Sequence, residues 1–304
     1  MDCFKPITMD DQTLFETIFA AVKPIASELT FPYLYMWKRD YNLSYTIAED
    51  HLCMVSQSRI YPPFAFCPIP IRGERDINKF KRALETVETY FREKGFELLF
   101  GRVEETRLDD LRTVYGNRME IEFLESASDY MYHASDLINL AGKKFSSKRN
   151  HINQFLRLYG EYEYVPVDET NLLECRRVLD EWCDKNETEC VHPDNCERLA
   201  CYELLDNWSK LKLKGALIKV NGRFEALTVG ELLNPETAAI RIEKGNSEIH
   251  GIYTVINRDF CAHEWSHIKY INREEDMGIE GLRKSKLSYN PAFMVNKFLV
   301  KVPH

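Results

Sequence analysis

The densest run of side chains that could do chemistry lies between residues 272 and 291. It begins Asn272-Arg273-Glu274-Glu275-Asp276-Met277-Gly278 and continues through Arg283-Lys284-Ser285-Lys286 to Tyr289. Acids before a helix and bases toward its end favour the helix dipole, which explains part of the pattern. It does not explain Asn272 at a strand end or Tyr289 beyond the basic turn. If the strands diverge here, both residues share a cleft with Glu243-Lys244, and we expect a functional site there.

A second motif, His263-Glu264-Trp265-Ser266-His267, matches the zinc-protease pattern, in which two histidines of one helix bind the metal. The apolar helix face ends near Trp265, and a strand is expected from residue 268. The two imidazoles would then not converge. A zinc metalloprotease therefore stays a remote alternative, and we expect no metal site.

The cysteines give no metal or disulfide framework. Nine cysteines are an odd number, which favours reduced thiols. Four of them form a cluster with His192 that lacks the paired spacing of a zinc knuckle: Cys183, Cys190, His192, Cys196 and Cys201. Phosphate-loop, dinucleotide-binding and nucleophile-elbow motifs do not occur in the sequence.

A basic stretch stands out in an acidic chain. Residues 143–151 contain Lys143, Lys144, Lys148 and Arg149 and no acid, whereas the whole chain has a formal charge of −8. Two interpretations stay open, a solvated cationic face and the recognition of phosphate groups. The overall charge argues against coating of bulk nucleic acid.

Length and composition predict a two-domain globular protein. The chain has 304 residues, of which 44% are hydrophobic and 29% charged. The first residues lack a signal-peptide pattern, and the longest apolar stretch, 60–71, contains four prolines. We expect a cytoplasmic protein without integral membrane association.

The periodicity of the first half predicts an α+β unit. Strands are expected at 4–7, 43–47, 51–56, 97–103 and 119–124, and helices at 14–22, 76–94 and 108–115. The prolines within 61–71 place that extended segment at an edge. We expect a first domain over residues 1–126.

The second half, residues 127–304, predicts a related order. A strand at 162–167 and a helix at 170–183 precede a hairpin at 216–233 that turns at Asn221-Gly222. A third strand, 238–243, leads to a helix from residue 251, a strand at 268–272, a helix at 278–287 and a strand at 294–300. The expected fold class is α+β (mixed α/β), with two tandem domains, each a mixed, mostly antiparallel sheet flanked by helices.

Several segments carry a family resemblance that covers nearly the whole chain. They are 129–132, 140–150, Glu243-Lys244, 251–257, 270–278 and 281–291. With these segments the sequence resembles the phosphatidylglycerol lysyltransferase C-terminal-domain-like family, which has two tandem GNAT-type acyltransferase folds. The run from Gly281 to Lys286 is more distantly similar to Fem-type transferases, which use aminoacyl-tRNA.

The resemblance implies an acyl- or aminoacyltransferase with its site in the second domain. GNAT domains usually bind the CoA pyrophosphate with a glycine-rich loop before the central helix. Here the loop 244–251 has two widely spaced glycines and an acid, which favours aminoacyl-tRNA over acyl-CoA as co-substrate. The first domain has Arg72-Gly73-Glu74 in the equivalent place and is expected to be a degenerate structural partner.

The implied reaction is attack of an amine or hydroxyl on an ester or thioester carbonyl. Glu243 or Glu231 is the expected base. Lys286, together with backbone N–H groups of 241–243, is expected to stabilise the anion, and Tyr289 is the expected acid. The expected substrate- and donor-binding residues are Lys143, Lys144, Lys148, Arg149, Lys244, Gly251, Tyr253, Asn257, Asn272, Glu274, Asp276 and Lys284. The expected partners are tRNA and a small-molecule, peptide or lipid-headgroup acceptor. The alternative is a catalytically silent small-ligand or RNA-binding module.

Overall fold

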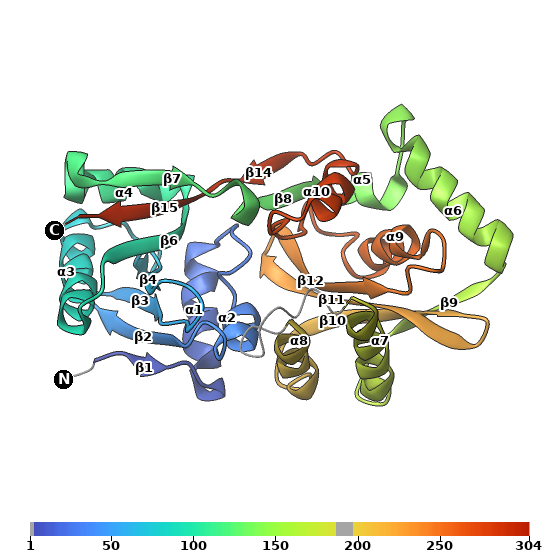
Figure 1. The fold of residues 1–304 in the computed structure, drawn as a ribbon, viewed down its shortest axis with the longest axis horizontal. Coiled ribbons are helices and arrows are strands. Elements are labelled where there is room, and N and C mark those ends of the chain that lie inside the picture. The colour runs from blue at the N-terminus through green and yellow to red at the C-terminus, as the bar shows by residue number, and fades with distance from the viewer. Residues whose placement is uncertain (1–2, 187–196, 304) are drawn as a thin grey trace. The chain divides into compact units, whose positions relative to one another are not determined.

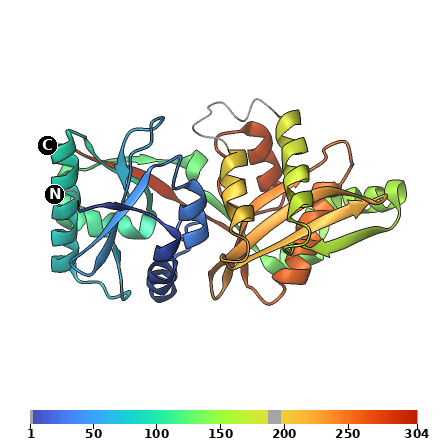
Figure 2. The ribbon, with the colours of Figure 1, turned by 90° about the horizontal axis from the view of Figure 1, so that it is seen from below.

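The computed structural model describes residues 3–186 and 197–303. The chain forms two compact units, Met1–Asp129 with Val295–His304, and Tyr130–Met294. Each unit contains one mixed sheet covered by helices on both faces (Figures 1 and 2). This confirms the expected fold class.

The first unit is built on a sheet with the strand order β1-β2-β3-β4-β6-β15-β7, in which β5 also pairs with β3. β4 is parallel to β6, whereas β6, β15 and β7 pair antiparallel. Its strands are β1 (Lys5–Pro6), β2 (Leu43–Ala48), β3 (His51–Ser56), β4 (Phe64–Ala65), β5 (Ile69–Pro70), β6 (Leu98–Glu104), β7 (Glu120–Phe123) and β15 (Lys297–Val302).

Helices α3 (Ile77–Lys94) and α4 (Glu105–Tyr115) supply apolar side chains to the core on one face of this sheet. In α1 (Gln12–Val22), Phe15 packs with Tyr45 of β2 and with Phe31 of α2 (Phe31–Trp37). The boundaries of α3 follow from local signals. Asp76 accepts hydrogen bonds from the backbone N–H groups of residues 78 and 79, and Gly95 ends the helix with a φ of 72°.

The second unit has a sheet with the order β14-β8-β13-β12-β11-β10-β9. β12 and β13 are parallel, and the hairpin of β10 and β11 turns at Asn221-Gly222, both with positive φ. The strands are β8 (Asp129–His133), β9 (Tyr162–Pro166), β10 (Leu213–Val220), β11 (Arg223–Asn234), β12 (Thr237–Gly245), β13 (Tyr270–Asn272) and β14 (Phe293–Val295).

Helices cover both faces of this second sheet. The central helix α9 (Ile252–Glu264) packs on one face with α5 (Ala134–Asn139) and α6 (Ser146–Tyr159), and α10 (Glu280–Leu287) follows β13. The helices α7 (Leu172–Lys185) and α8 (Glu197–Asp206) lie on the opposite face (Figure 1). This arrangement buries α9 along most of its length.

The last strand differs from the sequence expectation. Residues 294–300 were expected to complete the second domain, but β15 pairs with β6 and β7 of the first unit. The first unit therefore consists of two chain segments, whereas the expected division was 1–126 and 127–304. This pairing joins residues far apart in sequence, which no local pattern encodes.

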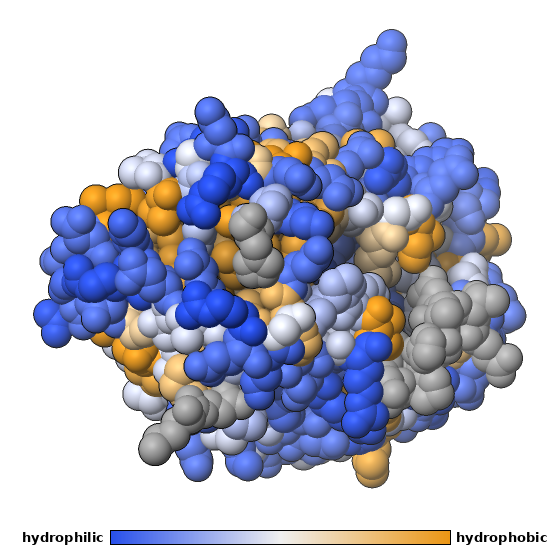
Figure 3. All heavy atoms as spheres, turned by 60° about the vertical axis from the view of Figure 1, so that its left-hand side comes forward, coloured by the Kyte–Doolittle hydropathy of each residue, from blue (hydrophilic) through white to orange (hydrophobic). Residues whose placement is uncertain are grey.

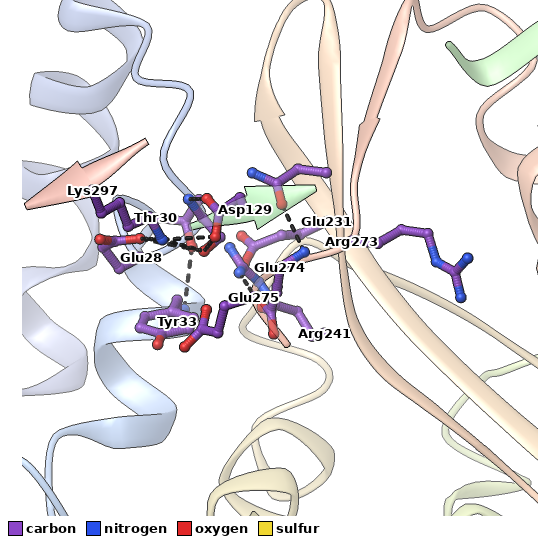
Figure 4. Close-up of polar contacts among 12 residues, drawn as sticks. Glu28, Thr30, Tyr33, Asp129, Glu231, Arg241, Arg273, Glu274, Glu275 and Lys297 are labelled. Carbon is purple, nitrogen blue, oxygen red and sulfur yellow. Dashed lines mark hydrogen bonds and ion pairs between the residues drawn. The ribbon is translucent and has the colours of Figure 1, made fainter. Parts of the chain in front are cut away.

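A buried ion cluster ties the two segments of the first unit together (Figure 4). The Nζ of Lys297 lies 2.6 Å from a Glu28 oxygen and 2.7 Å from an Asp129 oxygen, and all three side chains are at most 1% exposed. The hydroxyl of Ser27 donates to Asp129 as well. Burial, followed by the negative charge of Glu28, raises the pKa of nearby Glu104 to about 7.

One face of the molecule is mainly polar. Figure 3 shows one face of the molecule, on which hydrophilic side chains predominate and hydrophobic ones form small, separate patches. None of the helices within 3–186 and 197–303 has both the length and the apolar character that a bilayer-spanning segment needs.

Candidate functional site

The candidate site lies where β12 and β13 part. The two parallel strands pair only over residues 237–239 of β12 and 270–272 of β13 in their register, after which the chain leaves β13 into the loop 273–279. On its other side, β12 has a register shift opposite Val229 and Gly230 that leaves Arg241 without an opposed residue. In the half of β12 beyond this pairing, the Glu243 side chain lies beside α9, where Asn257 contacts it.

Five side chains meet beside this half of β12 and the helix α9. We call them the Glu243 cluster: Lys148, Glu243, Asn257, Arg273 and Tyr289. Glu243 Oε1 accepts a hydrogen bond from Arg273 Nη2 at 2.6 Å, and Glu243 Oε2 accepts one from Asn257 Nδ2 at 2.9 Å. The Glu243 and Arg273 side chains are 14% and 10% exposed. The carboxylate is thus fixed from two elements, α9 and the loop after β13.

Aromatic rings form one wall of the cluster. The guanidinium carbon of Arg273 lies 4.8 Å from the ring centroid of Tyr289 and 5.7 Å from that of Tyr132, and the Nζ of Lys148 lies 3.7 Å from the Tyr289 centroid. Burial raises the pKa of Tyr289 to about 12, against the opposing effect of Arg273. The phenol is therefore protonated at neutral pH and able to donate a proton.

Lys148 is the unusual member of the cluster. It is 8% exposed, and no hydrogen bond or ion pair of its ammonium group occurs among residues 3–186 and 197–303. Burial, together with the positive charge of Arg273, lowers its pKa to about 8, while Glu243 acts in the opposite direction. A lysine in this state changes its charge close to physiological pH.

Lys286, the expected anion stabiliser, has a different role. Its ammonium group donates to the backbone carbonyls of Arg273 at 2.5 Å, of Glu274 at 3.1 Å and of Glu275. An ammonium group has three donors, so these contacts use its full capacity. Lys286 is a positioning residue for the loop after β13 and not a donor for a reacting oxygen.

Glu231, the alternative base, lies in a separate ion cluster (Figure 4). Arg241 donates to Glu231 at 2.7 Å and to Glu274 at 2.6 Å, and the Arg241 side chain is fully buried. Burial raises the pKa of Glu274 to about 7, although Arg241 opposes this shift. Figure 4 shows Arg273 pointing away from these residues, and Glu231 and Glu243 therefore accept from different arginines, Arg241 and Arg273.

The other polar residues of the loop hold it in shape. Asn272 is buried, and its side-chain oxygen accepts from the backbone N–H of Glu274 at 2.8 Å. Asp276 is fully buried and accepts from the hydroxyl of Tyr130 at 2.6 Å and from Arg283 at 2.7 Å. Both residues were expected to bind substrate, but their contacts are internal to the protein. Lys284 is exposed.

The basic stretch does not form one patch. Lys148 faces inward, whereas Lys143, Lys144 and Arg149 are exposed. Lys144 pairs with Asp136 at 2.8 Å, and Arg149 donates to the backbone carbonyls of Leu140 and Gly142. The four charges therefore do separate things, and Lys148 is the one within the Glu243 cluster.

Lys244 and Tyr253, two of the expected substrate-binding residues near the start of α9, contact Trp182 of α7. Lys244 pairs with Glu197 at 2.8 Å, and its ammonium lies 3.6 Å from the Trp182 ring centroid. The Tyr253 hydroxyl donates to the Gly245 carbonyl and accepts from the Trp182 indole. These contacts border a small hollow on the α7 face, lined in part by Trp182, Gly245 and Asn246.

Gly251 begins α9 for a steric reason. A Cβ at this position would lie 2.5 Å from the backbone carbonyl oxygen of His151 in α6, and the φ of Gly251 is 84°. The glycine thus permits α6 to approach the start of α9.

The two candidate metal motifs have other structural explanations. α9 ends at Glu264, so His263 and His267 do not share a helix, and His263 stacks on Tyr164 at 4.2 Å. Cys183 and Cys201 are buried in α7 and α8. The remaining members of that cluster, Cys190, His192 and Cys196, lie outside the described residues.

Arg273 and Tyr132 are the members of the site that the sequence analysis did not select. Arg273 stands between Asn272 and Glu274, which were selected, and its place directly after a strand of the diverging pair was a usable signal. Tyr132 lies on β8, and its ring faces the guanidinium group of Arg273. Its hydroxyl donates to the Lys286 carbonyl at 2.8 Å. No spacing in the sequence connects it to the site.

Comparison with known proteins identifies the family. The family model described as phosphatidylglycerol lysyltransferase, C-terminal, matches residues 19–301. The chain is 32% identical to a conserved protein of unknown function from Bacteroides thetaiotaomicron, with 100% of both chains covered and a TM-score of 0.90.

Two more distant structures share the fold. L-PGS from Bacillus licheniformis is 15% identical, with 85% of this chain and 83% of that chain covered and a TM-score of 0.59. FemX is 9% identical, with coverage of 99% and 97% and a TM-score of 0.62. The two units have the tandem GNAT-type architecture, and the chain belongs to the phosphatidylglycerol lysyltransferase C-terminal family.

Proposed function

We propose that the second unit transfers an aminoacyl group from aminoacyl-tRNA, or a related acyl group, to an amine or hydroxyl acceptor. The observation that carries the proposal is the Glu243 cluster, in which a fixed carboxylate, a protonated phenol and a buried lysine meet where β12 and β13 part. The family of the chain supports this class of reaction.

The reaction needs one proton acceptor and one proton donor. The nitrogen or oxygen of the acceptor substrate attacks the ester carbonyl carbon, forms the new bond and loses a proton. The ester bond then breaks, and its leaving oxygen gains a proton. Glu243 is the proton acceptor of this proposal, because each of its oxygens accepts one hydrogen bond and has capacity for another. Tyr289 is the donor, since its phenol stays protonated at neutral pH.

Arg273 is a positioning residue in this scheme. Its guanidinium contacts both the Glu243 carboxylate and the Tyr289 ring, so it fixes the distance between the proton acceptor and the donor. Lys286 in turn holds the backbone of Arg273 through its carbonyl. The precise placement of two catalytic groups is a large part of what a transferase supplies.

An aminoacyl ester suits the start of α9 better than acyl-CoA does. The carbonyl oxygen of His151 lies against Gly251, where it would repel a pyrophosphate. Lys143 and Lys284 are exposed and are the members of the expected donor-binding set that we assign to contacts with tRNA phosphates.

A second function, ligand or RNA binding without transfer, is favoured by one observation. Arg273 lies between Glu243 and Tyr289 and is only 10% exposed, so it occupies space that a reacting carbonyl would need. Under this alternative, the protein binds charged tRNA or a small ligand and leaves the ester intact.

A transfer assay separates the two functions. Bulk tRNA charged with labelled amino acids is incubated with the purified protein and, in separate reactions, phosphatidylglycerol vesicles, short peptides, and small amines or alcohols. We expect label in one acceptor class at a rate above the protein-free control. Salt-sensitive binding of charged tRNA with no label in any acceptor would contradict the transfer proposal and support binding alone.

A further inference from the structure

The Glu243 cluster carries more positive than negative charge. Lys148 and Arg273 are two cations; Glu243 pairs with Arg273 and acts electrostatically on Lys148, and no second acid pairs with either cation in the described part of the chain. The other titratable groups beside Lys148 are the Tyr289 phenol and the imidazoles of His151 and His250, whose ring centroids are 5.3 Å apart. With neutral histidines, the cluster therefore has a net charge of about +1 when Lys148 is protonated.

Several polar atoms of the cluster have unused hydrogen-bonding capacity. Arg273 Nη1 and Asn257 Oδ1 are buried, and neither has a hydrogen-bond partner within residues 3–186 and 197–303. The Lys148 ammonium, in a side chain that is more than nine-tenths buried, contacts the Tyr289 ring and pairs with no acid of the described segments. The two buried donors, Arg273 Nη1 and Lys148 Nζ, are costly unless an acceptor arrives, whereas Asn257 Oδ1 is itself an acceptor and gains nothing from an anion.

We propose that the Glu243 cluster binds an oxyanion of a substrate, a carboxylate or a phosphate group, between the Nζ of Lys148 and the Nη1 of Arg273. Such a group neutralises the excess positive charge and supplies acceptors to both unused donors. The inference rests on the proposed function only for the statement that the oxyanion belongs to the acceptor or the donor of the transfer. Binding itself is independent of any reaction.

The site predicts a link between anion binding and protonation. An oxyanion binds the ammonium form of Lys148, and burial has lowered the pKa of this group to about 8 in the unliganded protein. Affinity is therefore highest below about pH 8 and falls above it. Close to that pH, binding takes up a proton.

The test is a calorimetric titration with two probes, N-acetylglycine for the carboxylate and glycerol 3-phosphate for the phosphate, near pH 7 and near pH 9. We expect at least one probe to bind, with affinity falling toward the higher pH. Lys148→Met should weaken binding about tenfold or more, since it removes a charge-assisted hydrogen bond. Lys148→Arg, which stays charged, should bind similarly at both pH values. Lys212→Met is the control, because Lys212 is an exposed lysine just before β10 and belongs neither to the Glu243 cluster nor to the expected donor-binding set.

The two probes distinguish the source of the oxyanion, since preference for one of them assigns the site to a carboxylate or to a phosphate. The inference is wrong if the folded wild-type protein binds neither probe, or if Lys148→Met binds as well as Lys212→Met. Should Lys148→Met fail to fold, the wild-type pH profile decides, and constant affinity across pH 8 contradicts the inference. Failure of the transfer assay with intact anion binding would overturn the proposed function and leave this site.

Discussion

Replacing Lys297 with Met removes the positive charge from the most deeply buried ion cluster of the first unit. The Nζ lies 2.6 Å from Glu28 and 2.7 Å from Asp129, and the side chains of the three residues are at most 1% exposed. Methionine fills a similar volume, so the main change is electrostatic. Two buried carboxylates then lose the ammonium group that pairs with both of them.

The magnitude follows from that burial. Removing one partner of a buried ion pair typically destabilises a protein by about 3–5 kcal/mol, because the remaining charge cannot be solvated. The matched control is Lys301→Met on the same strand, β15. Lys301 lies 3.1 Å from Glu97, but the two side chains are 38% and 68% exposed, so the expected cost is about 1 kcal/mol or less.

The assay is unfolding in denaturant followed by hydrogen exchange and mass spectrometry, which reports each unit separately. We expect Lys297→Met to lower the stability of peptides from β6 and β15, and Lys301→Met to leave them nearly unchanged. Adding Glu28→Gln to Lys297→Met should recover part of the loss. The reasoning is refuted if Lys297→Met costs no more than Lys301→Met.

Three further predictions concern other contacts. The pKa of Glu104 is raised to about 7 in the native state, so the native state keeps a proton that the unfolded chain loses near pH 4. The stability of the first unit therefore falls as pH rises between these two values. Glu104→Gln should flatten this slope, and an unchanged slope in urea melts would contradict the assignment. Gly251→Ala should lower the free energy of unfolding by about 1–3 kcal/mol, because of the positive φ and the close carbonyl. Its control is Gly281→Ala inside α10, where an added Cβ meets no atom within 4 Å, and this change should be neutral or stabilising by up to about 1 kcal/mol. Equal melting temperatures of the two variants would refute this. Lys286→Met should speed hydrogen exchange at 273–275, and unchanged exchange there would show that the loop does not depend on it.

Elements with strong local signals could be predicted from the sequence. The helix α3 has an N-cap at Asp76, apolar residues at helical spacing and a glycine at its end, and all three features act within a few residues. The hairpin at Asn221-Gly222 has the same property, because its turn type follows from two residues. Such segments fold as predicted whatever packs against them.

Pairings between distant segments could not be predicted. β15 has the alternation of an ordinary strand, and its neighbours β6 and β7 are chosen by tertiary packing. Its residue Lys297 pairs with an aspartate 168 positions away. The sequence therefore predicted the strand but not the unit to which it belongs.

Within the candidate site, the sequence predicted the region better than the roles. Of the residues expected to share one cleft, Glu243 and Tyr289 both contact Arg273, whereas Lys244 contacts Trp182 and Asn272 hydrogen-bonds within its own loop. Lys148 and Lys286 could not be told apart, because both are lysines in basic segments. Only the fold shows that Lys286 is occupied by backbone carbonyls whereas Lys148 is not.

The most direct test of the central claim is the single-turnover rate of aminoacyl transfer by Glu243→Gln relative to Glu161→Gln. Glu161 is an exposed glutamate just before β9, so its substitution controls for the loss of one acid. If the Glu243 cluster is the transfer site, Glu243→Gln lowers the rate by about 10²-fold or more, while Glu161→Gln keeps the wild-type rate. Equal rates in the two folded variants would contradict the account.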